Sequence, residues 1–271
     1  MTFDPQAVRA FEHAGWQRAA AHYASTFARA TRGFIDDLLD AARIGAAMHV
    51  LDLACGPGDV AAAAARRGAL PVGLDFSSAM IELARAGHRG IRFQEGDAEA
   101  LPFADKSFDA VVANFGIHHV PEPIRALHDT YRVLRSGGRV AFTAWAAPTE
   151  NIAWRLLYDA ISAHGDLAAA NAPPPGGSLR LPTDLLGLLN AAGFGETEAK
   201  RVHREWRVIA ARDLLDGFRR GTVRTAALID AQPPAALPEI EAAIASGMAE
   251  YRDGDGFAVP IVGILGSGIR D

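Results

Sequence analysis

Apolar and polar positions along the chain follow first a helical period and then an alternation of strand and helix patterns. Residues 34–44 ("FIDDLLDAARI") place apolar side chains three and four positions apart, within a helical region predicted from about Asp4 to Arg43 with breaks. Short apolar runs and helical patterns then alternate. They predict strands at 49–53, 70–74, 91–95, 109–113, 139–144, 196–208 and 257–266, and helices at 58–67, 77–87, 121–135 and from an N-cap at Thr183 to Gly193.

Short strands that are apolar on both faces and separated by helices are typical of a parallel sheet covered on both sides. The pattern therefore predicts a doubly wound α/β fold. Pro260, in the last predicted strand, indicates a sheet edge or a bulge. Ligands of such sheets bind beyond the carboxyl ends of the strands, so the loops that follow the strands should carry the functional residues.

The composition and net charge limit which kinds of binding partner are expected. The chain has 271 residues, of which 49% are hydrophobic and 22% charged, which predicts a globular core with a cap. The net charge is −5 and no long basic block occurs, so we expect no nucleic-acid partner. No apolar run approaches the roughly 18 residues of a membrane helix, and we expect a cytoplasmic protein without a membrane span. A monomer and a homodimer are both compatible with the sequence.

The loop after the first strand, in "VLDLACGPGDV" (50–60), contains two glycines that can adopt positive φ and bring backbone N–H groups close to a ligand. Gly56, Gly58 and Ala61 also satisfy the loose dinucleotide pattern G-x-G-x-x-G/A, so NAD is one candidate ligand. Asp52 would repel a pyrophosphate but suits a cationic ligand. It could equally cap nearby backbone N–H groups, and both interpretations stay open.

Acidic residues also follow the next two strands. Asp75 ends the second strand, where a carboxylate can accept hydrogen bonds from a ribose diol. An N-cap role for Asp75 is less favoured because Ser77 and Ser78 can cap the next helix themselves. Asp97 follows the third strand, where it could accept from the exocyclic amine of adenine, with the backbone N–H of Ala98 facing a ring nitrogen. Acids in three successive loops indicate an adenosine ligand rather than a chance arrangement.

Three stretches, which together contain four motifs, now resemble a known family. "VLDLACGPGDVAAAAA", "PVGLDFSSAMIELARA" and "FQEGDAEALPFADKSFDAVVANFGIHHVPEPIRALHDTYRVLRSGGRVAFTAW" are similar, in order and spacing, to the motifs of class I S-adenosylmethionine-dependent methyltransferases, nearest those of ubiquinone and menaquinone biosynthesis. The similarity covers about residues 45–146, with a weaker part in "LPTDLLGLLNAAGF". The resemblance implies S-adenosylmethionine as cofactor. It also implies a Rossmann-like, seven-stranded, mostly parallel sheet whose antiparallel last strand is 257–266.

The same resemblance assigns cofactor contacts to residues of this chain. The methionine moiety would be held by Asp52, Gly56 and Gly58, by the backbone of Ala54 and Cys55, and on its other side by Asn114 and Phe115. The adenosine would be held by Asp75 at the ribose, Phe76 and Met80 beside the adenine, and Asp97 and Ala98 at its edge. An N-terminal segment with Trp16 and Tyr23 would close over the cofactor. Cys55 is the only cysteine, which excludes an internal disulfide, and we expect a buried spacer rather than a nucleophile.

Methyl transfer from a sulfonium is an in-line displacement, and a general base helps only when the acceptor must lose a proton. His118 and His119 follow the fourth strand and are the candidate bases, although they could simply shape their loop. A metal site of these histidines with His128 matches no familiar ligand spacing, and none is expected.

The chain is predicted to have interleaved core and cap segments. They are an N-terminal helical lid (1–44), the cofactor-binding core (45–147, 181–208 and 256–271) and two helical cap insertions (148–180 and 209–255). Apolar residues of the caps favour a small, partly hydrophobic methyl acceptor, methylated on O, N or C. An NAD-dependent Rossmann-fold oxidoreductase and a non-catalytic S-adenosylmethionine-binding protein are the alternatives.

Overall fold

The core of the computed structural model, which describes residues 2–175 and 177–271, is a mixed sheet with the strand order β3-β2-β1-β4-β5-β8-β6. Strands β1 to β5 pair in parallel, and β8 runs antiparallel to both of its neighbours, β5 and β6. The predicted mostly parallel sheet with an antiparallel last strand is confirmed. The strands are β1 (His49–Leu53), β2 (Leu70–Asp75), β3 (Arg92–Glu95), β4 (Phe108–Ala113), β5 (Leu134–Trp145), β6 (Gly195–Val208), β7 (Arg252–Asp253) and β8 (Gly256–Ile269).

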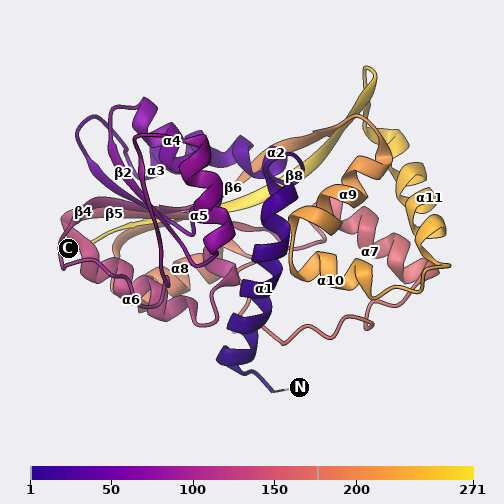
Figure 1. Cartoon of the computed structure of the whole chain (residues 1–271), viewed down its shortest axis with the longest axis horizontal. Helices are drawn as coiled ribbons and strands as arrows, with labels where there is room; N and C mark the ends of the chain where they lie inside the picture. Colours follow the sequence, from indigo (N-terminus) through magenta and orange to yellow (C-terminus); the bar gives the residue numbers. More distant parts are fainter. Residues whose placement is uncertain (1, 176) are drawn as a thin grey trace.

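The helices fall into a group that covers the sheet and a group beside it, with α1 between the two (Figure 1). Helices α3, α4, α5, α6 and α8 pack on strands, whereas α7, α9, α10 and α11 pack largely on one another. None of the helices in the described ranges is long and apolar enough to cross a membrane. The helices are α1 (Pro5–Tyr23), α2 (Ala28–Thr31), α3 (Ile35–Ala41), α4 (Asp59–Arg66), α5 (Ser78–Gly87), α6 (Pro123–Val133), α7 (Ile152–His164), α8 (Pro182–Ala191), α9 (Ala211–Gly221), α10 (Arg224–Asp230) and α11 (Leu237–Gly247), with 3-10 turns η1 (Arg32–Phe34), η2 (Ile117–His119) and η3 (Met248–Tyr251).

Both faces of the sheet are buried, as the apolar strands predict. Successive residues of a strand point to opposite faces, so Val50 joins the hydrophobic cluster that contains Leu38 of α3, while Leu51 joins the cluster that contains Leu127 of α6. The position of Pro260 also agrees with its prediction. Strand β8 pairs with β5 only from Gly263 onward, and Pro260 lies in the part of β8 that pairs with β6 alone.

Two local predictions were wrong. Strand β5 begins at Leu134 rather than 139, because "RSGG" is part of an irregular strand in which Gly137 has a φ of 75° and the register with β4 shifts. Helix α8 begins at Pro182, with Leu181 rather than Thr183 at the N-cap position. The carboxylate of Asp184 accepts hydrogen bonds from the backbone N–H groups of Arg180 and Leu181, each at 2.9 Å. These two donors, at the entry to the helix, are thereby satisfied.

Candidate active site

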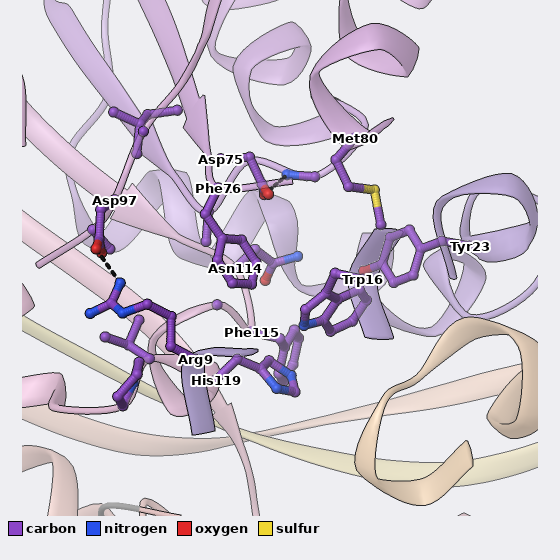
Figure 2. Close-up of a pocket in the computed structure, with 18 residues that line it drawn as sticks. Arg9, Trp16, Tyr23, Asp75, Phe76, Met80, Asp97, Asn114, Phe115 and His119 are labelled. Carbon is purple, nitrogen blue, oxygen red and sulfur yellow. Dashed lines mark hydrogen bonds and ion pairs between the residues drawn. The ribbon is translucent and has the colours of Figure 1, made fainter. Parts of the chain in front are cut away.

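A cavity of about 690 Å³, including space open to solvent, lies at the carboxyl ends of β1, β2 and β4 and beneath α1 (Figure 2). We call it the first cavity. Most of the predicted site residues line it together, although they come from four loops and the N-terminal helix. They are Trp16, Tyr23, Ala54, Gly56, Asp75, Phe76, Met80, Asp97, Ala98, Asn114, Phe115 and His119.

Four predicted site residues lie elsewhere. Asp52 and Cys55 line a smaller adjoining cavity, which Tyr23, Ala54, Gly56 and Asn114 share with the first cavity. His118 lines a separate, second cavity. Gly58 lines none of the three: its φ is +88°, and an added Cβ would lie 2.7 Å from the ring of Phe93. Glycine is therefore required at position 58 for the conformation of the turn and for its close packing against Phe93.

Asp52 caps a helix and still presents a free oxygen. Its Oδ2 accepts the backbone N–H of Ala61, in the first turn of α4, at 2.9 Å, whereas its Oδ1 is buried and has no hydrogen-bond partner among the described residues. Burial, with the nearby charge of Asp75, raises the pKa of this carboxyl well above its usual value. Both interpretations of Asp52 are therefore compatible: one oxygen caps α4, and the other is available to a cationic group.

Asp75 is held by two backbone donors. Its Oδ1 accepts the N–H of Ser77 and its Oδ2 accepts the N–H of Gly56, at 2.9 and 2.8 Å. Burial raises its pKa to about 6, against the opposing effect of these hydrogen bonds. Helix α5 is capped by Ser77, whose hydroxyl accepts the N–H of Met80, so Asp75 is not needed as the cap. Each of its oxygens keeps a lone pair for a ligand.

Asp97 pairs with the N-terminal helix. Its Oδ2 forms an ion pair with Arg9 of α1 (Figure 2). Its Oδ1 accepts the N–H of Glu99, and Arg9 also pairs with the Glu99 carboxylate. Gln17 makes a second attachment, because its Oε1 accepts the hydroxyl of Ser77 and the N–H of Ala79, at 2.7 and 2.9 Å. These contacts hold α1 over the first cavity.

The floor of the first cavity uses unusual backbone conformations. Ala54 and Phe115 both have positive φ, at 54° and 56°, which is uncommon for residues with a Cβ. A Cβ added to Gly116 would lie 2.5 Å from the Cβ of Ala54, so glycine is required for the two loops to approach. The ring of Phe115 stacks on Trp145 with centroids 3.8 Å apart. Strained backbone of this kind concentrates at functional sites.

The second cavity adjoins the first and shares Trp16 and His119 with it. It encloses about 960 Å³, including open solvent, and its walls come from the ends of β4 and β5, from α7, from Pro175 and residues 177–180, and from the start of α10. Its described lining residues are Trp16, Phe27, His118, His119, Trp145, Ala146, Pro148, Trp154, Tyr158, Pro175, Gly177, Ser178, Leu179, Arg180, Thr222, Val223, Arg224 and Thr225.

A buried carboxylate behind the shared wall connects three segments. Glu12 of α1 is fully buried, with its Oε2 3.0 Å from the Nδ1 of His119 and its Oε1 accepting the Nε–H of Arg224 at 2.6 Å. In the tautomer with hydrogen on Nδ1, His119 donates to Glu12 and keeps a lone pair on Nε2. His119 also packs edge-on against Trp16, with centroids 4.9 Å apart.

Sequence patterns did not identify Arg9, Glu12, Gln17 and Arg224 as site residues. One signal for Glu12 was present, because an acid at position 12 lies on the buried stripe of α1 with Val8, Gly15 and Ala19. An acid on an apolar helix face is expected to have a specific partner. The other three residues lie on ordinary polar positions, and their partners are distant in sequence.

Comparison with known proteins identifies the core of the chain. The family described as "Methyltransferase domain" matches residues 51–142, from β1 into β5. The chain carries a class I S-adenosylmethionine-dependent methyltransferase domain. The region around this methyltransferase domain aligns with the demethylmenaquinone methyltransferases of Clavibacter sepedonicus (44% identity over 103 residues, 37% of this chain and 42% of the relative) and Paenarthrobacter aurescens (38% over 128 residues, 47% and 50%).

The alignments therefore span about half the length of the curated relatives. The solved structure of a candidate methyltransferase from Bacillus halodurans extends the likeness beyond the methyltransferase domain. It has 25% identity and a TM-score of 0.58, and the match covers 88% of this chain and 99% of that one. The comparisons give no support to an oxidoreductase. The cofactor of the methyltransferase family is S-adenosylmethionine.

Proposed function

We propose that the protein transfers the methyl group of S-adenosylmethionine to a small, partly hydrophobic molecule. One observation carries the proposal: a cavity lined by the buried carboxylate of Asp75 meets a second, aromatic cavity at a wall formed by Trp16 and His119. Methyl transfer needs donor and acceptor in contact and water excluded, and adjoining cavities provide this. Its single cysteine, Cys55, is a buried free thiol. This supports a cytoplasmic location, because the cytoplasm keeps thiols reduced.

The first cavity fits the adenosine part of the cofactor. Asp75 would accept the ribose hydroxyls, since each oxygen has a lone pair left after its backbone hydrogen bond. Phe76 and Met80 would flank the adenine. Asp97 and the N–H of Ala98 would bind its edge, and Arg9 would release or share the Asp97 carboxylate as the adenine amine arrives.

The methionine end fits the adjoining small cavity. The free Oδ1 of Asp52 would bind the ammonium group of the cofactor. The ammonium group would give this buried carboxylate a positively charged partner. Gly56, the backbone of Ala54 and Cys55, and Asn114 would surround the rest, and Phe115 would face it from the loop after β4. Because Oδ2 of Asp52 already caps α4, a dinucleotide pyrophosphate would meet a carboxylate at this helix end. This arrangement disfavours NAD.

The residues around the shared wall would orient the acceptor and take its proton. Bound S-adenosylmethionine supplies an electrophilic methyl group. Glu12 fixes the ring of His119, whose Nε2 would accept a proton from an acceptor hydroxyl or other acid group. His118 would serve the second cavity as a neutral hydrogen-bonding group, because burial lowers its pKa well below the usual value. Trp16 would cover the reacting atoms from water. The cap segments 148–180 and 209–255 would enclose the acceptor.

A mass-spectrometric screen tests the activity. The protein would be incubated with S-adenosylmethionine and phenol, quinol and amine acceptors, and the expected result is a product heavier by one methyl group. Equilibrium binding to S-adenosylmethionine and to NAD provides the comparison. Saturable binding of NAD without binding of S-adenosylmethionine would overturn the proposal. Tight cofactor binding with no transfer to any acceptor would instead favour a non-catalytic binding protein.

The role of the Glu12–His119 pair has its own test. For an acceptor that must lose a proton, His119→Gln should lower kcat by about 10²–10⁴-fold with little change in cofactor affinity. Glu12→Gln should lower it less and shift the pH profile of kcat, because Glu12 acts through His119. His128→Gln is the matched control, since His128 lies on α6 outside both cavities. An unchanged kcat in His119→Gln would remove this residue from the mechanism.

A further inference from the structure

The second cavity has a charge character that the proposed function does not explain. Arg180 and Arg224 line it, and no aspartate or glutamate is among its described lining residues. A purely hydrophobic acceptor would gain nothing from two guanidinium groups at its binding site. An excess of positive charge in a partly enclosed cavity favours an anionic ligand.

Glu12 compensates only part of this charge. Arg224 donates its Nε–H to Glu12 and an Nη1 hydrogen to the carbonyl oxygen of Pro173, at 2.6 and 2.7 Å, and its Nη2 has no hydrogen bond within the described chain. The guanidinium of Arg180 forms no ion pair or hydrogen bond with any described residue. Donors of both arginines are thus available to a ligand, and planar guanidinium groups match carboxylate geometry.

His118 lies in the same space and has an unsatisfied polar atom. Its side chain is buried, and its Nδ1 has no hydrogen-bond partner among the described residues. Burial is the main cause of its lowered pKa, with further lowering from the nearby charges of His119, Arg180 and Arg224. A neutral His118 adds one hydrogen-bonding position to the cavity without adding charge. Buried polar atoms without a partner indicate a missing ligand or water.

Flat aromatic side chains form the apolar walls of the second cavity. Trp145 and Trp154 lie with centroids 4.7 Å apart, Phe27 packs edge-on against both, and Tyr158 and Trp16 complete the wall. Aromatic rings favour stacked or edge-on contacts with another ring. The walls therefore suit a planar aromatic ligand better than a flexible chain.

We propose that the acceptor is an aromatic carboxylic acid with a ring hydroxyl, bound by Arg180 and Arg224 at its carboxylate and by the aromatic walls at its ring. This inference rests on the proposed function. The hydroxyl lies toward the wall shared by the two cavities. The hydroxyl oxygen forms a bond to the methyl carbon as the carbon–sulfur bond breaks, the sulfonium becomes a thioether, and the hydroxyl proton passes to Nε2 of His119.

Binding of matched ring compounds tests the inference without requiring turnover. The protein saturated with S-adenosylhomocysteine would be titrated at neutral pH with 4-hydroxybenzoate, its neutral isostere 4-hydroxybenzamide and the cation tyramine. We expect 4-hydroxybenzoate to bind at least about tenfold tighter than the amide, the scale of charge-assisted hydrogen bonds. Arg180→Gln and Arg224→Gln should each reduce that preference several-fold. Equal or tighter binding of the amide or of tyramine would overturn the proposal.

Control variants distinguish the effect of losing a positive charge in the cavity from the effect of unfolding. Arg220→Gln removes an exposed positive charge from α9 outside the cavity and should leave the preference unchanged. Arg224→Lys keeps the charge and should retain part of the preference. If Arg224→Gln unfolds because Glu12 loses its partner, the exposed Arg180 still decides the matter. An unchanged preference in Arg180→Gln and in Arg224→Lys would contradict the proposal. Selective carboxylate binding without methyl transfer would defeat the proposed function while leaving the binding site intact.

Discussion

Asp52 lies near the end of β1 and Asp75 ends the neighbouring β2; both are buried, and the charge of Asp75 disfavours the charged form of Asp52. Among the described residues, neither carboxylate has a cationic side chain within hydrogen-bonding distance, and both accept hydrogen bonds from backbone N–H groups. Stability alone would favour apolar residues at these positions, since buried charges are costly. The proposed cofactor would explain their presence, because it brings hydroxyl groups and a positive charge.

Cofactor affinity should depend on pH through Asp75. Its folded-state pKa of about 6 lies above the unfolded value, so between pH 3.8 and about 6 the folded protein binds more protons and loses stability as the pH rises. The ionised carboxylate is the better acceptor for ribose hydroxyls. Affinity for S-adenosylmethionine should therefore fall by up to about tenfold per pH unit below pH 6. Calorimetric titration at several pH values measures this.

The variant Asp75→Ala should weaken cofactor binding by about 1–3 kcal/mol at neutral pH, through the lost hydrogen bonds. It should also abolish the pH dependence below 6. A wild-type affinity that is constant from pH 5 to 7, or an Asp75→Ala variant with unchanged affinity, would show that Asp75 does not bind the ribose.

Asp52→Asn should separate binding from stability. The amide keeps an oxygen for the N–H of Ala61 but removes the charge, so affinity for S-adenosylmethionine should fall at least about tenfold. The cofactor-free variant should unfold at the same or a higher temperature, because the carboxylate is disfavoured by burial. Thermal unfolding with and without the cofactor checks both. A less stable variant with normal affinity would assign Asp52 to capping alone.

Helix α1 is the element that brings the two cavities together. It pairs with the loop after β3 through Arg9, contacts the start of α5 through Gln17, and approaches the start of α10 at Gly15. A Cβ on Gly15 would lie only 2.2 Å from Cγ1 of Val223. The close approach at this position depends on glycine.

Gly15→Ala should therefore displace α1 from Val223. We expect a loss of about 1–3 kcal/mol in the free energy of unfolding, together with weaker cofactor binding, because Trp16 is the next residue. Gly187→Ala in the exposed part of α8 is the control. Nothing lies within 4 Å of its added Cβ, so it should stabilise the protein by about 0.5–1 kcal/mol. Denaturant unfolding compares them, and equal effects would mean that α1 tolerates the displacement.

The elements of the core could be predicted because each strand and helix carries its own apolar period and is bounded by residues with local conformational preferences. The acids at 52, 75 and 97, at or just beyond strand ends, could be assigned to one sheet edge because parallel strands bring their carboxyl ends together there. The contacts of α1 could not be predicted in this way. Glu12 lies 107 residues from His119 and 212 from Arg224, and no periodic pattern determines which distant side chain a helix face will meet. For the same reason, the sequence did not distinguish His118 from His119.

At the scale of the whole molecule, cofactor binding should stabilise both the sheet and its cover. S-adenosylmethionine at about 100 times its Kd should add about 2.7 kcal/mol to the free energy of unfolding. Hydrogen exchange should slow in residues 5–23 as well as in the loops of the first cavity, since Trp16 and Tyr23 line it. Exchange in α11, which lines none of the three cavities, is the internal control. Protection of the loops without protection of α1 would contradict its role as a cover.

The carboxylate of Glu12 also bears on the order in which product and spent cofactor would leave the site. If α1 moves outward to release spent cofactor, Glu12 leaves with it, and His119 and Arg224 lose their shared negative partner at the same moment. An anion held by Arg224 would then be the remaining counter-charge and would dissociate slowly. On the proposed function, product and spent cofactor would therefore depart in a coupled sequence rather than independently, and we expect ordered steady-state kinetics.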